Sequence, residues 1–407
     1  MKLFTEGRLG PITLRNRTIR SAAFEGMGRD NGPTEMLRDY HLSVARGGVG
    51  MTTLAYAGIC RSALSFTTQL WLRPEIVPQL REITDGIHAA GAKASIQLGH
   101  CGNMTHRSTA GCIPVGASSG FNLYSPTLVR GLRRDEIREI ARCFGEAVRT
   151  ARDAGFDCVE IHAGHGYLIS QFLSPYTNHR HDEYGGSLQN RMTFMNMCLE
   201  ESLRAAGSDM ACIVKTNMRD GFKGGLEIDD CLTVAREIER AGVHGIVLSG
   251  GFVSKAPMYV MRGEMPIYSM THYMKQWWLK YGVRLVGRMM IPSEPFKPLY
   301  FLDDARLFRR ELSLPLIYVG GVVDRAGADH VLDDENFDFV QMGRALLNEP
   351  DFVNRMKQSE GNHACGCEHV NYCIARMYSR EMACHQHCPD LPERIRREIE
   401  EIKAYER

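Results

Sequence analysis

Residues 133–161 read RRDEIREIARCFGEAVRTARDAGFDCVEI, and this stretch decides the fold. Between Ile137 and Ala151 the apolar residues recur at intervals of three and four, which is the pattern of one face of an amphipathic helix. The pair Ala154–Gly155 then ends the helix, because glycine adopts the left-handed conformation of a helix C-cap without strain. The run DCVEI (157–161) follows at once and predicts a short buried strand.

The same order of helix, Ala-Gly pair and strand occurs twice more, in HAAGAKASIQL (88–98) and ERAGVHGIVLS (239–249). Eight short apolar runs can be counted along the chain. They are RTIRSAAF (17–24), GMTTLAYAG (50–58), KASIQL (93–98), DCVEI (157–161), ACIVKT (211–216), HGIVLS (244–249), PLIYV (315–319) and DFVQMG (338–343). Continuous rather than alternating apolar runs are typical of parallel strands that are covered on both faces.

Eight such strands alternating with helices predict an α/β protein with a single (β/α)8 TIM barrel. A doubly wound sheet is the alternative architecture. It would place a G-x-G-x-x-G turn after the first strand, and the segment SAAFEGMGRDNG (21–32) does not have that spacing. The barrel is predicted over residues 1–360, followed by a Cys/His-rich C-terminal extension over residues 361–407 that ends in a helix.

The chain has 407 residues, of which 44% are hydrophobic, and a formal net charge of +1. This near-zero charge gives no electrostatic reason to expect binding to nucleic acid or to an anionic membrane. No apolar run reaches the ~18 residues that cross a bilayer, and the first 20 residues lack the apolar segment of a secretory signal. We therefore expect a cytoplasmic protein, in which the cysteines are reduced thiols.

The run IHAGHGYLISQFLSPYTNHRHDEYGG (161–186) begins at the end of the fourth predicted strand, where a TIM barrel places its chemistry. Two imidazoles three residues apart, His162 and His165, can hydrogen-bond one oxygen of a ligand. Tyr167 adds a phenolic proton donor. The spacing alone is also compatible with an exposed histidine-rich loop, and a metal site would lack further ligands at a recognised spacing. The position at a strand end favours a catalytic group.

Two more polar residues end predicted strands at the same mouth of the barrel. Gln97 ends the third strand and Lys215 ends the fifth. A buried lysine is unfavourable unless its charge meets a negative charge or a polar ligand. The simpler alternative is that each of the two side chains lies at a strand end and reaches solvent. Together the two side chains favour a flat heterocycle that carries hydrogen-bonding groups.

The loops after the seventh and eighth strands, VGGVVDRAGA (319–328) and MGRALLNEP (342–350), are rich in glycine. Barrels often bind phosphate with these two loops, because small residues let an anion approach the backbone N–H groups. Ordinary turns between strand and helix are the alternative. The candidate phosphate ligands are Gly320, Gly321, Gly343 and Arg344. The residues alone thus predict a barrel that binds a phosphorylated cofactor.

The segment HAGHGYLISQFLSPYTNHRHDEYGG (162–186) resembles the signature of the old yellow enzyme family of FMN-dependent ene reductases. More specifically, it is similar to the branch that contains 2,4-dienoyl-CoA reductase and trimethylamine dehydrogenase. Other motifs have counterparts in the same order, so the resemblance covers residues 2–390. They include LRNRTIRSAAFEGM (14–27), ARGGVGMTTLAYAG (45–58), SIQLGHCG (95–102), GFKGGLE (221–227) and MGRALLNEPDF (342–352).

The resemblance implies an FMN-binding barrel that uses NAD(P)H in a ping-pong reaction. In that reaction a hydride passes through flavin N5 to an alkene conjugated to a carbonyl, and the substrate is a small-molecule enone or similar compound. Gln97 would contact the flavin pyrimidine ring, and Lys215, where many members have Arg, would lie near N1 and the C2 carbonyl. The flavin would be lined by Ala22, Ala23 and Phe24, and its phosphate would be held by Gly320, Gly321, Gly343 and Arg344.

In the reaction that the resemblance implies, His162 and His165 would bind the carbonyl oxygen and Tyr167 would act as the proton donor. One departure from the family is Phe24, which stands where some members have a Cys or Thr that tunes the flavin potential. The chain also stops at Arg407, before the second nucleotide-binding half of the larger relatives, so FAD and an internal electron relay are not expected.

The segment CEHVNYCIARMYSREMAC (367–384) is similar to the iron–sulfur motif of that branch. Cys367, Cys373 and Cys384 match its cysteines, but Val370 occupies the position of the second ligand, and valine cannot bind iron. Cys365 could replace it only through a different path of the loop. Three interpretations stay open: an iron–sulfur cluster, a zinc site that uses the neighbouring histidines, and a degenerate motif with free thiols.

Three functions from different classes follow from the sequence. The leading one is an NAD(P)H-dependent FMN ene reductase, and the second is an FMN enzyme that oxidises an amine or a saturated ketone. The third is a cofactor-free barrel lyase or metabolite-binding protein, which would be colourless. The sequence does not decide between a monomer and a homo-oligomer, or between NADH and NADPH.

Overall fold

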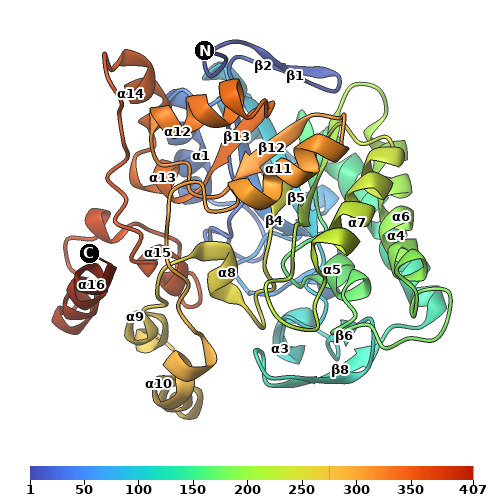
Figure 1. Cartoon of the computed structure of the whole chain (residues 1–407). Helices are drawn as coiled ribbons and strands as arrows, with labels where there is room; N and C mark the ends of the chain where they lie inside the picture. Colours follow the sequence, from blue (N-terminus) through green and yellow to red (C-terminus); the bar gives the residue numbers. More distant parts are fainter. Residues whose placement is uncertain (275, 407) are drawn as a thin grey trace.

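The computed structural model describes residues 1–274 and 276–406, and its centre is a closed barrel of eight parallel strands (Figure 1). The strands follow one another around the barrel in chain order, and the last pairs with the first. They are β3 (Thr18–Arg20), β4 (Met51–Gly58), β5 (Lys93–Gly99), β9 (Cys158–His162), β10 (Ala211–Asn217), β11 (Gly245–Ser249), β12 (Leu316–Val319) and β13 (Phe339–Met342). Each strand overlaps one of the predicted apolar runs, so the predicted TIM barrel is confirmed.

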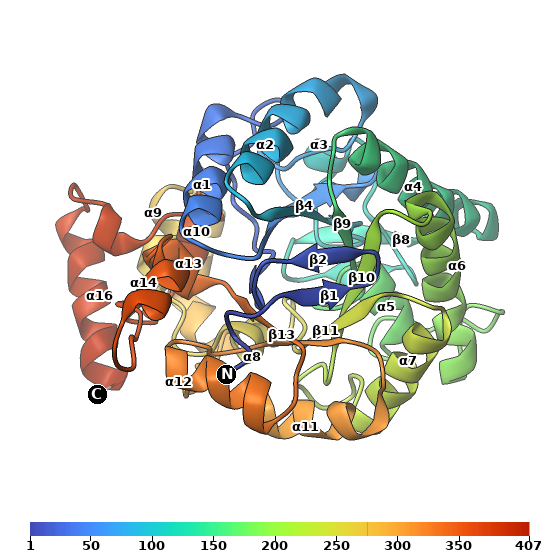
Figure 2. The same cartoon turned by 90° about the horizontal axis from the view of Figure 1, so that it is seen from above.

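Helices connect the strands and cover the outside of the barrel (Figure 2). They are α1 (Glu35–Arg46), α2 (Val77–Ala89), α4 (Arg134–Asp153), α6 (Leu188–Ala206), α7 (Ile228–Arg240), α11 (Leu302–Glu311), α12 (Arg325–Asp329) and α13 (Arg344–Asn348). Helix α4 shows why these elements form. Its apolar face, from Ile137 to Ala151, is buried, and Gly155 after it has a φ of +82°. The predicted helix and its glycine C-cap are therefore both present.

The amino end of the barrel is closed by a hairpin of β1 (Gly7–Leu9) and β2 (Ile12–Leu14). Its apolar side chains form one cluster with residues at the same end of the barrel interior, among them Ile19, Ile213 and Phe339. Figure 2 shows the hairpin lying across this end. Because this end is filled by apolar side chains, ligands can enter the barrel only from the carboxyl ends of the strands.

Additional elements surround the carboxyl ends of the strands, opposite the hairpin (Figure 1). They are α3 (Arg107–Ala110), β6 (Val115–Gly116), β7 (Gly120–Asn122), β8 (Thr127–Gly131), α5 (Leu168–Leu173), α8 (Pro257–Met261), α9 (Ile267–His272) and α10 (Trp277–Met290). The C-terminal part contributes α14 (Phe352–Gln358), α15 (Tyr372–Arg376) and α16 (Glu393–Glu406). Ile395 and Ile399 of α16 belong to a buried cluster against which Tyr268 of α9 packs, so the tail is attached to the barrel's loops. Within residues 1–274 and 276–406, none of the helices combines the length and apolar character that a membrane crossing requires.

Candidate active site

Three polar side chains meet inside the barrel around the carboxylate of Glu160 in β9. Gln97 Nε2 donates to Glu160 Oε1 at 2.6 Å, and Gln341 Nε2 donates to Glu160 Oε2 at 2.9 Å. Lys215 Nζ lies 2.9 Å from Glu160 Oε1, and the two side chains of this ion pair are 3% and 0% exposed. Because a buried charge is tolerated when it is paired and hydrogen-bonded, this network explains how the barrel holds both ions in its interior.

Glu160 is a site residue that the sequence analysis above does not predict. The sequence nevertheless contains a feature that points to Glu160, because a carboxylate inside the buried run DCVEI requires a partner. Its partners lie on other strands, far along the chain. By holding the amide of Gln97 and the ammonium group of Lys215, Glu160 fixes the orientation of two side chains that are predicted to contact a cofactor.

The turn after β9 brings His165 and Tyr167 next to His162, the last residue of the strand. The ring centroids of His162 and His165 are 5.0 Å apart, and those of His162 and Tyr167 are 4.8 Å apart. His165 has a φ of +61°, and its backbone N–H donates to Asn217 Oδ1 at 3.0 Å. Its Nε2 lies 2.8 Å from Ser249 Oγ, at the end of β11. Contacts with the next two strands thus support an uncommon backbone conformation that gathers the three predicted residues.

Burial determines the protonation of this group. Burial, followed by the charge of Lys215, lowers the pKa of His165 to about 3. Burial lowers the pKa of His162 well below its ordinary value, and it raises the pKa of the Tyr167 phenol. His162 Nδ1 is buried and has no hydrogen-bond partner in the described part of the chain, as expected of a group that binds a ligand. At neutral pH the site therefore presents two neutral imidazoles and a protonated phenol.

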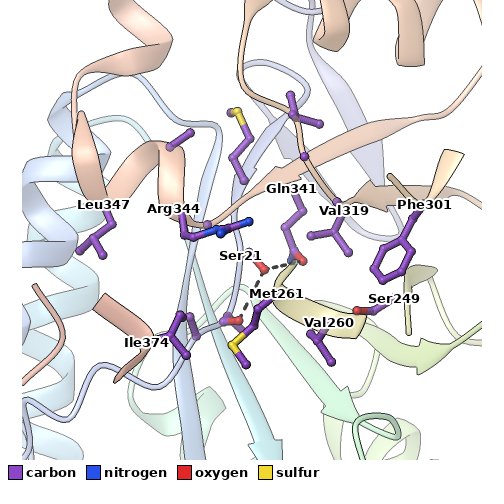
Figure 3. Close-up of a pocket in the computed structure, with 18 of the residues that line it drawn as sticks. Ser21, Ser249, Val260, Met261, Phe301, Val319, Gln341, Arg344, Leu347 and Ile374 are labelled. Carbon is purple, nitrogen blue, oxygen red and sulfur yellow. Dashed lines mark hydrogen bonds between the residues drawn. The ribbon is translucent and has the colours of Figure 1, made fainter. Parts of the chain in front are cut away.

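A cavity of about 170 Å³ opens beside His165, and most of the predicted cofactor residues line it (Figure 3). Figure 3 shows the hydrogen bond between Ser21, which follows β3, and Gln341 at the cavity. The predicted residues that line the cavity are Ala22, Ala23, Lys215, Gly320, Gly321, Gly343 and Arg344. Gln97, by contrast, lies in the network around Glu160. The cavity thus connects the barrel interior with the two glycine-rich loops.

The glycines after β12 are required by the backbone and by close packing. Gly320 and Gly321 have φ values of +133° and +75°. A Cβ atom at Gly320 would lie 2.8 Å from the ring of Phe301, and one at Gly321 would lie 2.8 Å from the backbone nitrogen of Leu299. Glycine therefore keeps this wall free of side chains, which permits an anionic group to approach the backbone closely.

Arg344 supplies a positive charge at the opposite loop, directly after β13 (Figure 3). Its Nη1 donates to Asn371 Oδ1 at 2.8 Å, and its guanidinium lies 5.4 Å from the ring centroid of Phe296. The hydrogen-bond partner is a neutral amide, so the positive charge stays available to an anion. Asn371 belongs to the C-terminal extension, which thereby helps to position the predicted phosphate ligand.

Comparison with known proteins decides the family. Residues 2–250 match the NADH:flavin oxidoreductase / NADH oxidase family. The chain belongs to this family. It is 37% identical to the 4,4'-dithiodibutanoate disulfide reductase of Rhodococcus erythropolis over 378 residues, which cover 93% of each protein. It is 29% identical to an NADH oxidase of Thermoanaerobacter brockii, of which it spans 52%.

Among solved structures, the old yellow enzyme homologue from Zymomonas mobilis superimposes with a TM-score of 0.72 at 23% sequence identity. That alignment covers 93% of this chain and 97% of the other. This likeness shows the shared barrel fold. The family match makes the chain an FMN-dependent NAD(P)H oxidoreductase of the old yellow enzyme family. Its membership of a flavoenzyme family argues against a cofactor-free lyase or a binding protein.

The cavity of this NADH:flavin oxidoreductase fits FMN. Gly320, Gly321 and Arg344 form a wall without bulky side chains next to a cation, which suits a phosphate group. Lys215 places a second cation at the barrel end of the same cavity, where it would stabilise negative charge on the ring of a reduced flavin. Glu160 would act on the cofactor through Lys215 and Gln97, as a positioning residue.

Phe24 takes a position different from the one that the apolar run RTIRSAAF suggests. Strand β3 ends at Arg20, and Phe24 stacks on Phe66 with a centroid distance of 4.6 Å. The cause is an ion pair between Arg20 and Glu25, whose atoms lie 2.7 Å apart. Five extended residues would span about 16 Å, so this contact requires the chain to leave the strand. Phe24 is not among the residues that line the cofactor cavity, and its contact with the flavin stays a prediction.

The C-terminal cysteines do not form a four-thiolate site. Cys367, Cys373 and Cys384 line one small pocket next to Arg344. Val370 is buried in the apolar cluster that α16 forms with the tail. In the part of the chain that the structure describes, no three His, Cys, Asp or Glu side chains are arranged to hold a metal ion. The residues as placed do not fit the iron–sulfur cluster of the related branch.

Proposed function

We propose that this NADH:flavin oxidoreductase reduces a carbon–carbon double bond that is conjugated to a carbonyl group. The observation that carries the proposal is the group of His162, His165 and Tyr167, whose rings lie about 5 Å apart beside the cofactor cavity. As neutral rings, the two histidines can each donate an N–H to the same carbonyl oxygen. A protonated phenol next to them is suited to deliver a proton.

FMN held by Lys215, Arg344 and the glycine-rich loops would supply hydride transfer from NAD(P)H to the β-carbon of the substrate. Negative charge then develops on the carbonyl oxygen, where the N–H groups of His162 and His165 stabilise it. Tyr167 keeps its proton at Oη until this stage and donates it to the α-carbon as a general acid. The substrate thereby gains one hydride and one proton, and solvent reprotonates Tyr167.

The two half-reactions test this proposal separately. The FMN-loaded enzyme is first reduced with NADH or NADPH under anaerobic conditions and is then mixed with 2-cyclohexenone. We expect the absorbance of the oxidised flavin to return as cyclohexanone forms in equal amount. Reoxidation by oxygen but not by the enone would refute the proposed substrate class.

Disulfide reduction is a second candidate, favoured by the relative that is 37% identical over 93% of both chains and is named for such an activity. Two electrons would cleave the S–S bond, and Tyr167 would protonate one of the departing thiolates. The same reduced enzyme can be mixed with 4,4'-dithiodibutanoate, and the thiols that form can be titrated. Faster reoxidation by the disulfide than by 2-cyclohexenone would favour this candidate.

Oxidation of an amine or a saturated ketone is the remaining alternative. Such a substrate would bleach the oxidised flavin without NAD(P)H. The four-thiolate motif of the related branch is interrupted at Val370, so an electron exit through a cluster is not supported. The order of preference is therefore alkene reduction, disulfide reduction and then substrate oxidation.

A further inference from the structure

A second and larger cavity, which we call the large groove, lies outside the cofactor cavity. It measures about 1150 Å³, compared with about 170 Å³ for the cofactor cavity. One wall is formed by residues 116–129, which include hairpin β7–β8, and the other by residues 265–274 and 276–291, which include α9 and α10. Figure 1 shows these segments at the carboxyl ends of the barrel strands.

The described walls of the large groove combine many apolar side chains with neutral polar ones and carry almost no charge. Among the described residues that line it, Lys255 alone carries a formal charge at neutral pH. Six of the lining residues are methionines, namely Met104, Met265, Met270, Met274, Met289 and Met290. Methionine side chains adapt to irregular apolar shapes, and together with aromatic residues such as Trp278 they suit a hydrophobic ligand.

Several of these apolar side chains are exposed to solvent. Trp278 is 56% exposed and Met289 is 79% exposed on one wall, and Phe121 is 58% exposed on the other. Contiguous exposed apolar surface of this kind usually marks a binding site, because its burial by a ligand is favourable. The groove therefore has the character of a ligand site rather than of ordinary surface.

The inner end of the large groove adjoins the catalytic group. Gln171 lines the groove, and its Nε2 donates to the backbone oxygen of Gly166, the residue between His165 and Tyr167. Val253, another lining residue, donates its backbone N–H to the oxygen of His165 at 3.0 Å. A molecule that occupies the groove would therefore have one end near the loop that carries His165 and Tyr167.

We propose that the large groove binds the body of a bulky, uncharged, hydrophobic substrate, such as a multi-ring enone, while its carbonyl end reaches His162 and His165. This inference rests on the proposed function and specifies the substrate class for the same site. Among the lining residues that the structure describes, Lys255 is the single cation, which does not match a multiply charged carrier such as a coenzyme A thioester, since that carrier needs several Arg or Lys contacts. The free carbonyl compound is therefore the expected substrate.

The first experiment compares two enones on the FMN-loaded wild-type enzyme. Progesterone is a multi-ring uncharged enone, and 2-cyclohexenone contains little more than the reacting group. We expect the Kd of progesterone for the oxidised enzyme, measured from the change in flavin absorbance, to be at least about 10-fold lower than that of 2-cyclohexenone. Equal affinities, or tighter binding of crotonyl-CoA than of progesterone, would overturn the inference.

The second experiment uses neighbouring residues of α10 as matched pairs. Trp278 and Val286 line the groove, whereas Trp277 and Leu285 are exposed on the same helix and do not line it. We expect Trp278→Ala and Val286→Glu to raise the ratio of the progesterone KM to the 2-cyclohexenone KM at least about 10-fold. Trp277→Ala and Leu285→Glu should leave the ratio unchanged. Equal ratios in all four variants would contradict the inference.

If the enzyme reduces only 2-cyclohexenone and progesterone does not bind, the groove inference fails and the proposed function stands. If neither enone reoxidises the reduced flavin, the proposed function fails. The groove is then still tested by binding alone: progesterone should bind to the oxidised wild-type enzyme and should no longer bind to the Trp278→Ala variant.

Discussion

Replacing Lys215 by Met removes the cation from an ion pair that is closed off from solvent inside the barrel. Lys215 Nζ lies 2.9 Å from Glu160 Oε1, and neither side chain is more than 3% exposed. The substitution leaves the Glu160 carboxylate with hydrogen bonds from Gln97 and Gln341 but without a counter-charge. We expect it to lower the free energy of unfolding.

The size of the effect follows from the geometry. Two unit charges 2.9 Å apart attract each other by roughly 6 kcal/mol at an effective dielectric constant of 20. Desolvation of both ions offsets part of this attraction, and breaking a buried pair typically costs about 3–5 kcal/mol. We expect a loss in this range for Lys215→Met and for Glu160→Gln. The double variant has no unpaired buried charge, so its loss should be smaller than the sum of the two by about 2 kcal/mol.

Urea unfolding at a fixed FMN concentration measures these losses. Because Lys215 also lines the cofactor cavity, the Kd of FMN is determined for each variant, and the contribution of bound FMN to stability is subtracted. Lys223→Met provides a matched control, since Lys223 is exposed, and its effect should stay within about 0.5 kcal/mol. If the loss of stability in the double variant equals the sum of the two single losses, the two charges do not stabilise each other and the reasoning is wrong.

Three further predictions concern the histidine loop and the glycine-rich loop. Tyr167→Phe should slow reoxidation of the reduced flavin by 2-cyclohexenone about 100-fold while reduction by NAD(P)H keeps its rate, because only the reoxidation by the enone needs the phenolic proton; stopped-flow spectroscopy follows both half-reactions. His165 has its pKa lowered to about 3, so below pH 6.5 the unfolded chain binds a proton that the folded chain does not, and stability falls with falling pH. Between pH 7 and pH 5 the wild type should therefore lose at least about 1 kcal/mol more stability than His165→Asn, measured by urea unfolding, and equal losses would contradict this assignment. Gly321→Ala should raise the Kd of FMN about 10-fold, because its Cβ would meet backbone atoms at a positive φ, whereas Gly120→Ala, with no atom near its Cβ, should leave the Kd unchanged in a fluorescence titration.

The barrel was predictable because its strands and helices are encoded in local patterns. Continuous apolar runs such as ACIVKT mark strands covered on both faces, and they matched β10 and its neighbours closely. The order of the eight runs implied that the ends of the predicted strands share one mouth. His162, His165 and Tyr167 were found in this way, because they follow a strand directly.

Other features escaped the sequence because they depend on residues that are distant along the chain. The role of Glu160 requires Lys215, Gln97 and Gln341 to converge from three other strands. Phe24 continued an apolar run, but it stacks on Phe66, a residue far along the chain. In each case a contact between distant residues outweighs a local preference.

The barrel, the resemblance to the family and the candidate catalytic residues could be predicted from the sequence, since periodicity, glycine caps and short motifs are local properties of the chain. The three-dimensional structure was needed to show which polar groups neutralise one another inside the barrel, and that Val370 lines the pocket of the three cysteines while it packs in the apolar cluster of α16. It was also needed to show that residues 116–129 and α10 enclose a groove. The physical reason is that pairing of buried charges and enclosure of a cavity depend on distances between segments, which local patterns do not encode.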